Sequence, residues 1–155
     1  MTRRRQILGR EGEEFAARYL ESRGYQIIAR NVRAGRVEID LVARAPGRLV
    51  FAEVKSRRAT PDDGFGTHGR AAEAVDERKQ RRIRRGALAW LDARPELRRR
   101  GVRIRFDVLT CILHDRLDSS DAPHAPRRGE SEARNQTSAP GKGTRWSIEH
   151  WRAAF

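Results

Sequence analysis

Three side chains near the middle of the chain have types and spacing that suit metal-dependent chemistry. Asp40 lies in the segment 37–42, and Glu53 and Lys55 lie in the segment 51–55, which begins shortly afterwards. Both segments are rich in the apolar and β-branched residues that favour strands. Two carboxylates and a lysine on neighbouring strands are a candidate site for a divalent cation.

The two strands are expected to form a hairpin, because Pro46-Gly47 between them is a turn signal. A hairpin that is symmetric about this turn brings three pairs of residues face to face: Arg44 with Leu49, Asp40 with Glu53, and Glu38 with Lys55. Strand side chains alternate between faces, so the four charged residues of the last two pairs project from one side of the sheet. Opposed carboxylates, with Cβ atoms about 5 Å apart, repel each other unless a cation lies between them.

Such a site suits phosphodiester hydrolysis. Mg²⁺ is usually held by one or two carboxylates together with water and a substrate phosphate, and it lowers the pKa of a bound water. Lys55 would orient that water, stabilise developing charge or, with a lowered pKa of its own, act as a base. The same residues also fit a salt-bridge ladder on a solvated sheet face, and spacing alone leaves both interpretations open.

Lysine is rare in this chain, which favours a chemical role for Lys55. Lysine and arginine together number 34, but the lysines are only Lys55, Lys79 and Lys142. Arginine does not lose its proton, and it does not replace lysine at a chemical site.

The whole chain is strongly basic. Its 155 residues suffice for one domain, and a net charge of +13 with a pI near 11.4 indicates a polyanionic partner, nucleic acid first and an anionic membrane surface second. No segment reaches the roughly 20 apolar residues of a membrane-spanning helix, and no signal-peptide core follows the basic N-terminus. A single cysteine excludes an internal disulfide, so a cytoplasmic protein is expected.

Hydrophobic periodicity outlines the remaining organisation. It predicts helices over 6–23 and 73–93, and strands over 25–32 and 102–113 around the hairpin. We therefore expect a core over 1–113, a disordered or mobile insertion over 114–144, and a C-terminal segment over 145–155 that docks on the core. Gly12 lies within the apolar stripe of the first helix, which indicates close approach to another element.

The second helix carries an unusual density of positive charge. Contact with nucleic-acid phosphates is the favoured interpretation, and a solvated helix face is the alternative. The residues expected to bind phosphate are Arg78, Lys79, Arg81, Arg82 and Arg85. For Asp107, on the strand over 102–113, pairing with a neighbouring arginine is the favoured interpretation, and a role as a third acidic ligand is the alternative.

The order of the motifs resembles the YraN family, which is similar to Holliday-junction resolvases and to restriction-endonuclease-like nucleases. The resemblance spans residues 8–108 and returns at 150–155, and its motifs are Gly12-Glu13, Gly24-Tyr25, Glu38-Ile39-Asp40, Glu53-Val54-Lys55, Lys79 with Arg82, and Arg105-Phe106-Asp107-Val108. It implies an α/β fold with a restriction-endonuclease-like three-layer core, in which a mixed central sheet is flanked by helices. It also implies a metal site on Asp40 and Glu53, with Lys55 beside them and Glu13 as a third, helix-borne acid.

The leading hypothesis is a Mg²⁺- or Mn²⁺-dependent endonuclease acting on DNA, with branched DNA among its candidate substrates. A homodimer is expected, because a DNA junction offers two scissile strands. The rival hypothesis is a non-catalytic nucleic-acid-binding protein of the same fold. A third hypothesis is a basic assembly protein that binds ribosomal or other RNA.

Overall fold

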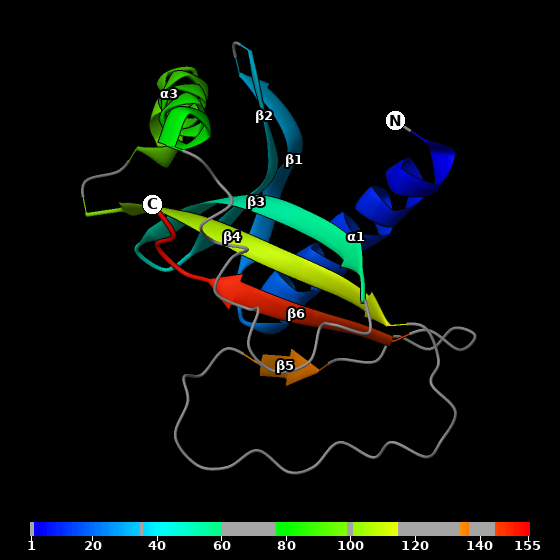
Figure 1. Cartoon of the computed structure of the whole chain (residues 1–155). Helices are drawn as coiled ribbons and strands as arrows, with labels where there is room; N and C mark the ends of the chain where they lie inside the picture. Colours follow the sequence, from blue (N-terminus) through cyan, green and yellow to red (C-terminus); the bar gives the residue numbers. More distant parts are fainter. Residues whose placement is uncertain (1, 35, 60–76, 99–100, 115–133, 137–144) are drawn as a thin grey trace.

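The computed structural model describes residues 2–34, 36–59, 77–98, 101–114, 134–136 and 145–155. Its elements follow the chain in this order (Figure 1): α1 (Arg3–Ser22), β1 (Gln26–Ala34), β2 (Val37–Ala45), β3 (Arg48–Arg58), α3 (Glu77–Asp92), the 3₁₀ turn η1 (Pro95–Leu97), β4 (Arg103–His114), β5 (Arg134–Gln136) and β6 (Arg145–Trp151). Apart from His114 and β5, the expected insertion over 114–144 lies outside the described residues.

The strands form one mixed sheet in the order β1-β2-β3-β4-β6-β5. Neighbours pair antiparallel except β3 and β4, which are parallel in a register that runs from Arg48 opposite Arg103 to Arg58 opposite Leu113. The segment that joins two parallel strands must cross back over the sheet, and α3 belongs to this crossover. The expected α/β class, with a mixed sheet and packed helices, is confirmed.

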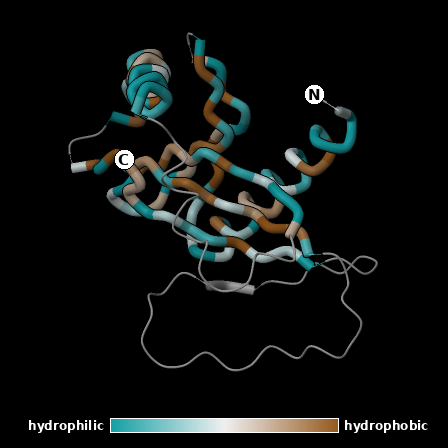
Figure 2. Tube along the Cα trace, viewed as in Figure 1, coloured by the Kyte–Doolittle hydropathy of each residue, from teal (hydrophilic) through white to brown (hydrophobic). Residues whose placement is uncertain are grey.

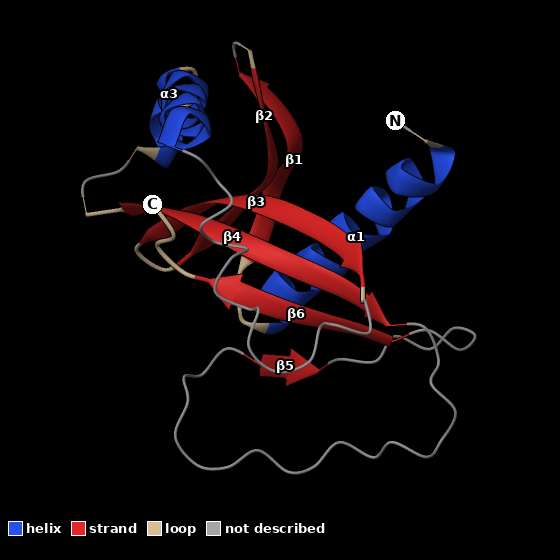
Figure 3. Cartoon of the chain, viewed as in Figure 1, coloured by secondary structure: helices blue, strands red, loops and turns tan. Residues whose placement is uncertain are grey.

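The two helices cover opposite faces of the sheet (Figure 3). Alternate residues of β3 show this directly: Val50 and Ala52 pack in a cluster with α1, whereas Leu49 and Phe51 pack in a second cluster with α3. In the described part of the chain, each helix therefore has its own core, and β3 contributes to both.

The first helix agrees closely with its prediction. It buries Phe15, Ala16, Tyr19 and Leu20 against the sheet. It ends at Ser22, and the expected stop signal Gly24 follows two residues later: its φ of +82° is a left-handed conformation that side chains disfavour, and its N–H donates to the Glu21 carbonyl.

The second helix lies over β1 and β2. Its buried residues are Ile83, Gly86, Ala87, Trp90 and Leu91, whose three- and four-residue spacing is that of one helix face, as the periodicity predicted. The first residues of the predicted helix, 73–76, lie outside the described part of the chain.

A buried polar network ties the C-terminus to β4. Asp107 is fully buried and accepts hydrogen bonds from Arg105 Nε (2.7 Å) and Nη2 (2.6 Å), and from the Ala153 N–H (3.0 Å). His150 Nε2 lies 2.7 Å from Asp107 Oδ2. Burial alone would raise the pKa of Asp107, but the bonds from His150 and Arg105 hold it below its ordinary value. Of the two roles open to Asp107, the structure shows pairing with arginine.

The predicted close approach at Gly12 is confirmed. A Cβ atom built at Gly12 would lie 1.8 Å from Ser56 Oγ and 2.8 Å from Ser56 Cβ, on β3. Gly12 precedes Glu13 and Ser56 follows Lys55, so this contact brings α1 against the strand that carries Glu53 and Lys55.

We expect Gly12→Ala to lower the free energy of unfolding by roughly 1–3 kcal/mol, because α1 must move away from β3 to admit the methyl group. Urea unfolding measures the change. Gly9→Ala is the matched control on the same helix: a Cβ at Gly9 meets nothing within 4 Å, and alanine there should stabilise by about 0.5–1 kcal/mol. Equal stability of the two variants would contradict the close contact.

Candidate metal centre

The predicted register of the β2–β3 hairpin is confirmed, but its ladder is shorter than expected. The ladder runs from Ala45 opposite Arg48, through Arg44 opposite Leu49, to Leu41 opposite Ala52. It ends one residue before Asp40, so the expected pair of Asp40 with Glu53 is not part of it.

The side chain of Asp40 continues the contact between the strands. Asp40 Oδ2 accepts a hydrogen bond from the Val54 N–H at 2.6 Å. A longer ladder in the same register would place Ile39 opposite Val54. The carboxylate therefore accepts from an N–H that a backbone carbonyl of β2 would otherwise satisfy; this N–H is partly buried, so it is poorly placed to bond water instead.

Glu38 does not share this site. Ile39 and Val42, three residues apart, both pack in the cluster with α3, so β2 does not keep strict alternation across Asp40. Glu38 is exposed and lies 3.9 Å from Arg33. The predicted pair of Glu38 with Lys55 was wrong, because β2 has left the ladder with β3 at that point.

The negative charges of neighbouring acids change the pKa of Asp40. Burial and the negative charge of Glu53 raise the pKa of Asp40 to about 7, although the hydrogen bond from the Val54 N–H opposes the rise. Glu13, which is half-buried on α1, raises the pKa of Asp40 further. Three acids predicted from separate segments therefore share one electrostatic neighbourhood.

Two lysines complete the site. Lys55 is half-buried, and burial together with the charge of Lys79 lowers its pKa, while Glu53 raises it. Lys79 reaches from α3 and forms an ion pair with the Glu53 carboxylate. The sequence predicted a phosphate-binding role for Lys79 and gave no indication of this ion pair. The scarcity of lysine that drew attention to Lys55 applies equally to Lys79.

The arrangement suits a cation that also uses water and substrate. Within the described residues, no three Asp, Glu, His or Cys side chains form a group able to hold a metal ion. Mg²⁺ does not require such a group, since one or two carboxylates, water and phosphate oxygens commonly suffice. A divalent cation would also relieve the crowding of negative charge that raises the pKa of Asp40.

Glu14, the acid that follows Glu13 on α1, is paired with arginines. Glu14 is exposed and forms ion pairs with Arg18 at 2.9 Å and Arg30 at 2.6 Å, which hold its pKa below its ordinary value. Pairing with basic side chains therefore accounts for Glu14.

The arginines of α3 lie on its solvent side, and most of the helix is hydrophilic (Figure 2). Arg78, Arg81, Arg82 and Arg85 are all exposed. Arg81 pairs with Glu77 at 3.1 Å, and Arg82 donates to the Arg36 carbonyl at 2.9 Å. These four arginines therefore form an exposed basic surface on α3.

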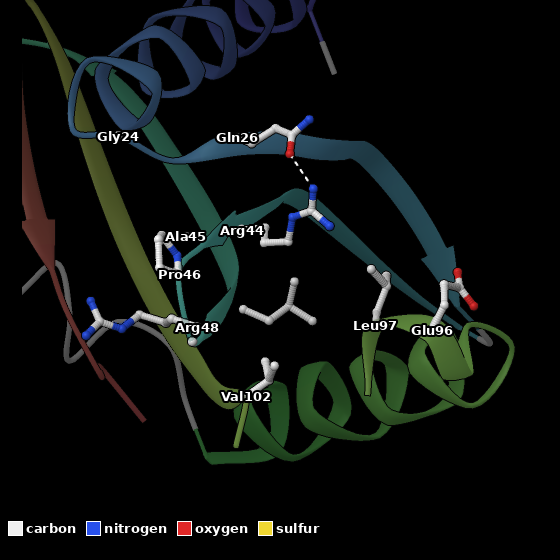
Figure 4. Close-up of a pocket in the computed structure, with 11 residues that line it drawn as sticks. Gly24, Gln26, Arg44, Ala45, Pro46, Arg48, Glu96, Leu97 and Val102 are labelled. Atoms are coloured by element: carbon white, nitrogen blue, oxygen red, sulfur yellow. Dashed lines mark hydrogen bonds between the residues drawn. The ribbon is translucent and has the colours of Figure 1, made fainter. Parts of the chain in front are cut away.

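Two clefts in the described structure lie away from the carboxylates. One, of about 400 Å³, is formed at the β2–β3 turn and η1, and Figure 4 shows Arg44 donating to Gln26 beside it. The other, of about 460 Å³, lies between β1 and α3. Neither is lined by Asp40, Glu53 or Lys55.

Fold and site together define an α/β protein with acidic and lysine side chains gathered where a hairpin of a mixed sheet opens. The chain belongs to the family described as "Uncharacterised protein family UPF0102", whose model matches residues 12–111. The predicted resemblance to the YraN family is thereby confirmed. The matched residues include all of Glu13, Asp40, Glu53, Lys55 and Lys79.

Three relatives illustrate this membership. A UPF0102 protein of Nocardia farcinica is 46% identical over 109 residues, which are 70% of this chain and 79% of the relative. One of Rhodococcus opacus is 47% identical over 106 residues, or 68% and 82% of the two chains. One of Syntrophotalea carbinolica is 41% identical over 126 residues, or 81% and 94%.

Neither helix that the structure describes is long and apolar enough to span a membrane.

The raised pKa of Asp40 makes stability depend on pH. Between about pH 4 and pH 7, the folded protein retains a proton at Asp40 that the unfolded chain releases, so this residue lowers stability as pH rises through that interval. We expect Asp40→Asn to raise the free energy of unfolding at pH 8 by roughly 2–4 kcal/mol, with little change at pH 4. The amide oxygen of asparagine can still accept the Val54 N–H.

Guanidinium unfolding at the two pH values measures this difference. Glu38→Gln, which neutralises an exposed carboxylate on the same strand, is the control and should change stability equally at both. A gain for Asp40→Asn that does not depend on pH would contradict the raised pKa.

Proposed function

We propose that this protein is a Mg²⁺- or Mn²⁺-dependent endonuclease with a restriction-endonuclease-like fold, which hydrolyses phosphodiester bonds in DNA. The observation that carries the proposal is the position of Asp40. Its carboxylate is held against the Val54 N–H beside Glu53, where β2 leaves β3. The fold assignment is supported by the mixed sheet, by helices on both of its faces, and by the acid that α1 contributes.

Each residue of the site has a role in this proposal. Asp40 and Glu53 would hold the metal, with Glu13 as a third acid. The bound metal would polarise a phosphoryl oxygen and acidify a water. Lys55 would orient that water, stabilise the developing charge or accept a proton, and its lowered pKa suits the last role.

The basic surface would hold the substrate. The exposed arginines of α3 and a net charge of +13 suit contacts with backbone phosphates, which position a nucleic acid without reading its sequence. Branched DNA is a candidate substrate, and a homodimer would present two such sites to the two strands of a junction.

Cleavage assays test the proposal. Four-way junction, nicked and linear DNA are incubated with the purified protein and Mg²⁺ or Mn²⁺. We expect metal-dependent cutting of at least one substrate, and a loss of roughly 10²–10⁴-fold on Lys55→Met. Asp40→Asn and Glu53→Gln should also abolish cutting, whereas Glu38→Gln should cut as the wild type does. Cleavage that survives in all three site variants would overturn the enzyme assignment.

The rival is a non-catalytic nucleic-acid-binding protein, and the exposed arginines of α3 support it equally. It predicts binding that weakens steeply with salt and no cleavage with either metal. Competition among junction DNA, duplex DNA and structured RNA at fixed salt separates a DNA-binding role from an RNA-binding one.

A further inference from the structure

Lys79 forms an ion pair with Glu53, one of the two carboxylates assigned to the metal. It belongs to the basic helix α3, yet its ammonium is bonded to Glu53 on β3. The side chain of Glu53 is 12% exposed, whereas that of Lys79 is 44% exposed. An acid so nearly buried beside Asp40 needs a compensating cation, and Lys79 supplies one from the solvent side.

We propose that Lys79 is a displaceable counter-cation, which neutralises Glu53 in the metal-free protein and moves to a substrate phosphate when a divalent metal binds Glu53. This inference rests on the metal site of the proposed function. It makes Lys79 a residue that couples metal binding to nucleic-acid binding.

The choice of lysine fits this role. Arginine is used for almost every positive charge in the chain, and its planar guanidinium forms two-pronged bonds to carboxylates that are hard to displace. Lysine is a compact charge on a flexible stem of four carbons, with three donors that can be redirected. Its partial exposure leaves room for such a movement.

The influence of Lys79 extends over the site. Its charge lowers the pKa of Asp40 as well as that of Lys55. Lys79 therefore stands among the two acids that would hold the metal and the lysine that would act on the water.

Displacement would leave Lys79 near other phosphate-binding candidates. It remains tethered to α3, whose solvent side presents Arg78, Arg81 and Arg85. Without metal, Lys79 is engaged by Glu53; with metal, it is available to a phosphate. Metal and nucleic acid should therefore strengthen each other's binding, and the coupling must be reciprocal.

The first experiment measures Mn²⁺ binding to the full chain by calorimetry, without nucleic acid. Lys79→Met should bind Mn²⁺ more tightly than wild type, by roughly five- to tenfold, because the competing cation is gone. Lys79→Arg should bind no more tightly than wild type, since the ion pair with Glu53 is retained. Arg85→Met removes one exposed charge from the same helix and should change the affinity less than about twofold.

The second experiment measures the affinity for a labelled DNA duplex by anisotropy, with and without Ca²⁺, which holds the complex without cleavage. Ca²⁺ should strengthen binding by the wild type more than by Lys79→Met. Arg85→Met should bind DNA more weakly by the same factor in both conditions, as expected for a phosphate contact that is independent of metal.

The outcomes separate this inference from the proposed function. If Lys79→Met binds Mn²⁺ more tightly than the wild type, and the wild type cleaves no DNA, the counter-cation role of Lys79 is supported and the nuclease assignment is overturned. If the wild type cleaves DNA but Lys79→Met binds Mn²⁺ no more tightly than the wild type does, the nuclease is supported and the counter-cation role of Lys79 is overturned. Absence of Mn²⁺ binding in both proteins overturns both. Thermal unfolding confirms that each variant is folded, and Lys79→Arg provides a second readout that preserves the charge.

Discussion

The site depends on one backbone donor, the N–H of Val54, which loses its strand partner where β2 leaves β3. An amide shielded from water and without an acceptor destabilises a fold, and the carboxylate of Asp40 supplies the acceptor for this partly buried N–H. The same hydrogen bond holds Asp40 in a buried position beside Glu53, and this environment raises its pKa to about 7. The hydrogen bond that satisfies the Val54 N–H at the end of the ladder therefore also places the Asp40 carboxyl group beside that of Glu53.

Both helices contribute a charged side chain to this pair of acids. From one side of the sheet, the contact between Gly12 and Ser56 sets α1 against β3 and brings Glu13 toward the other acids. From the other side, α3 packs on the hairpin and extends Lys79 to Glu53. The site is thus assembled from β2, β3, α1 and α3, and packing of the two cores sets its composition.

Much of the framework could be predicted, because its signals are local. A turn between two apolar segments sets the register that pairs Arg44 with Leu49, and a glycine in a left-handed conformation ends α1. The prediction failed for Glu38, because extending the hairpin symmetrically assumes that the strands stay together. They separate at Asp40, and no local pattern in the chain indicates where strands diverge.

Residue types and spacing were sufficient to locate Asp40, Glu53 and Lys55, to mark Gly12 as a point of close approach, and to indicate family membership. Packing between distant segments was needed to assign partners. It joins Lys79 to Glu53, 26 residues away in the chain, and it joins His150 to Asp107, 43 residues away. The physical reason is that a side chain's type limits what it can bind, whereas burial and neighbouring charge, which depend on the whole fold, select what it does bind.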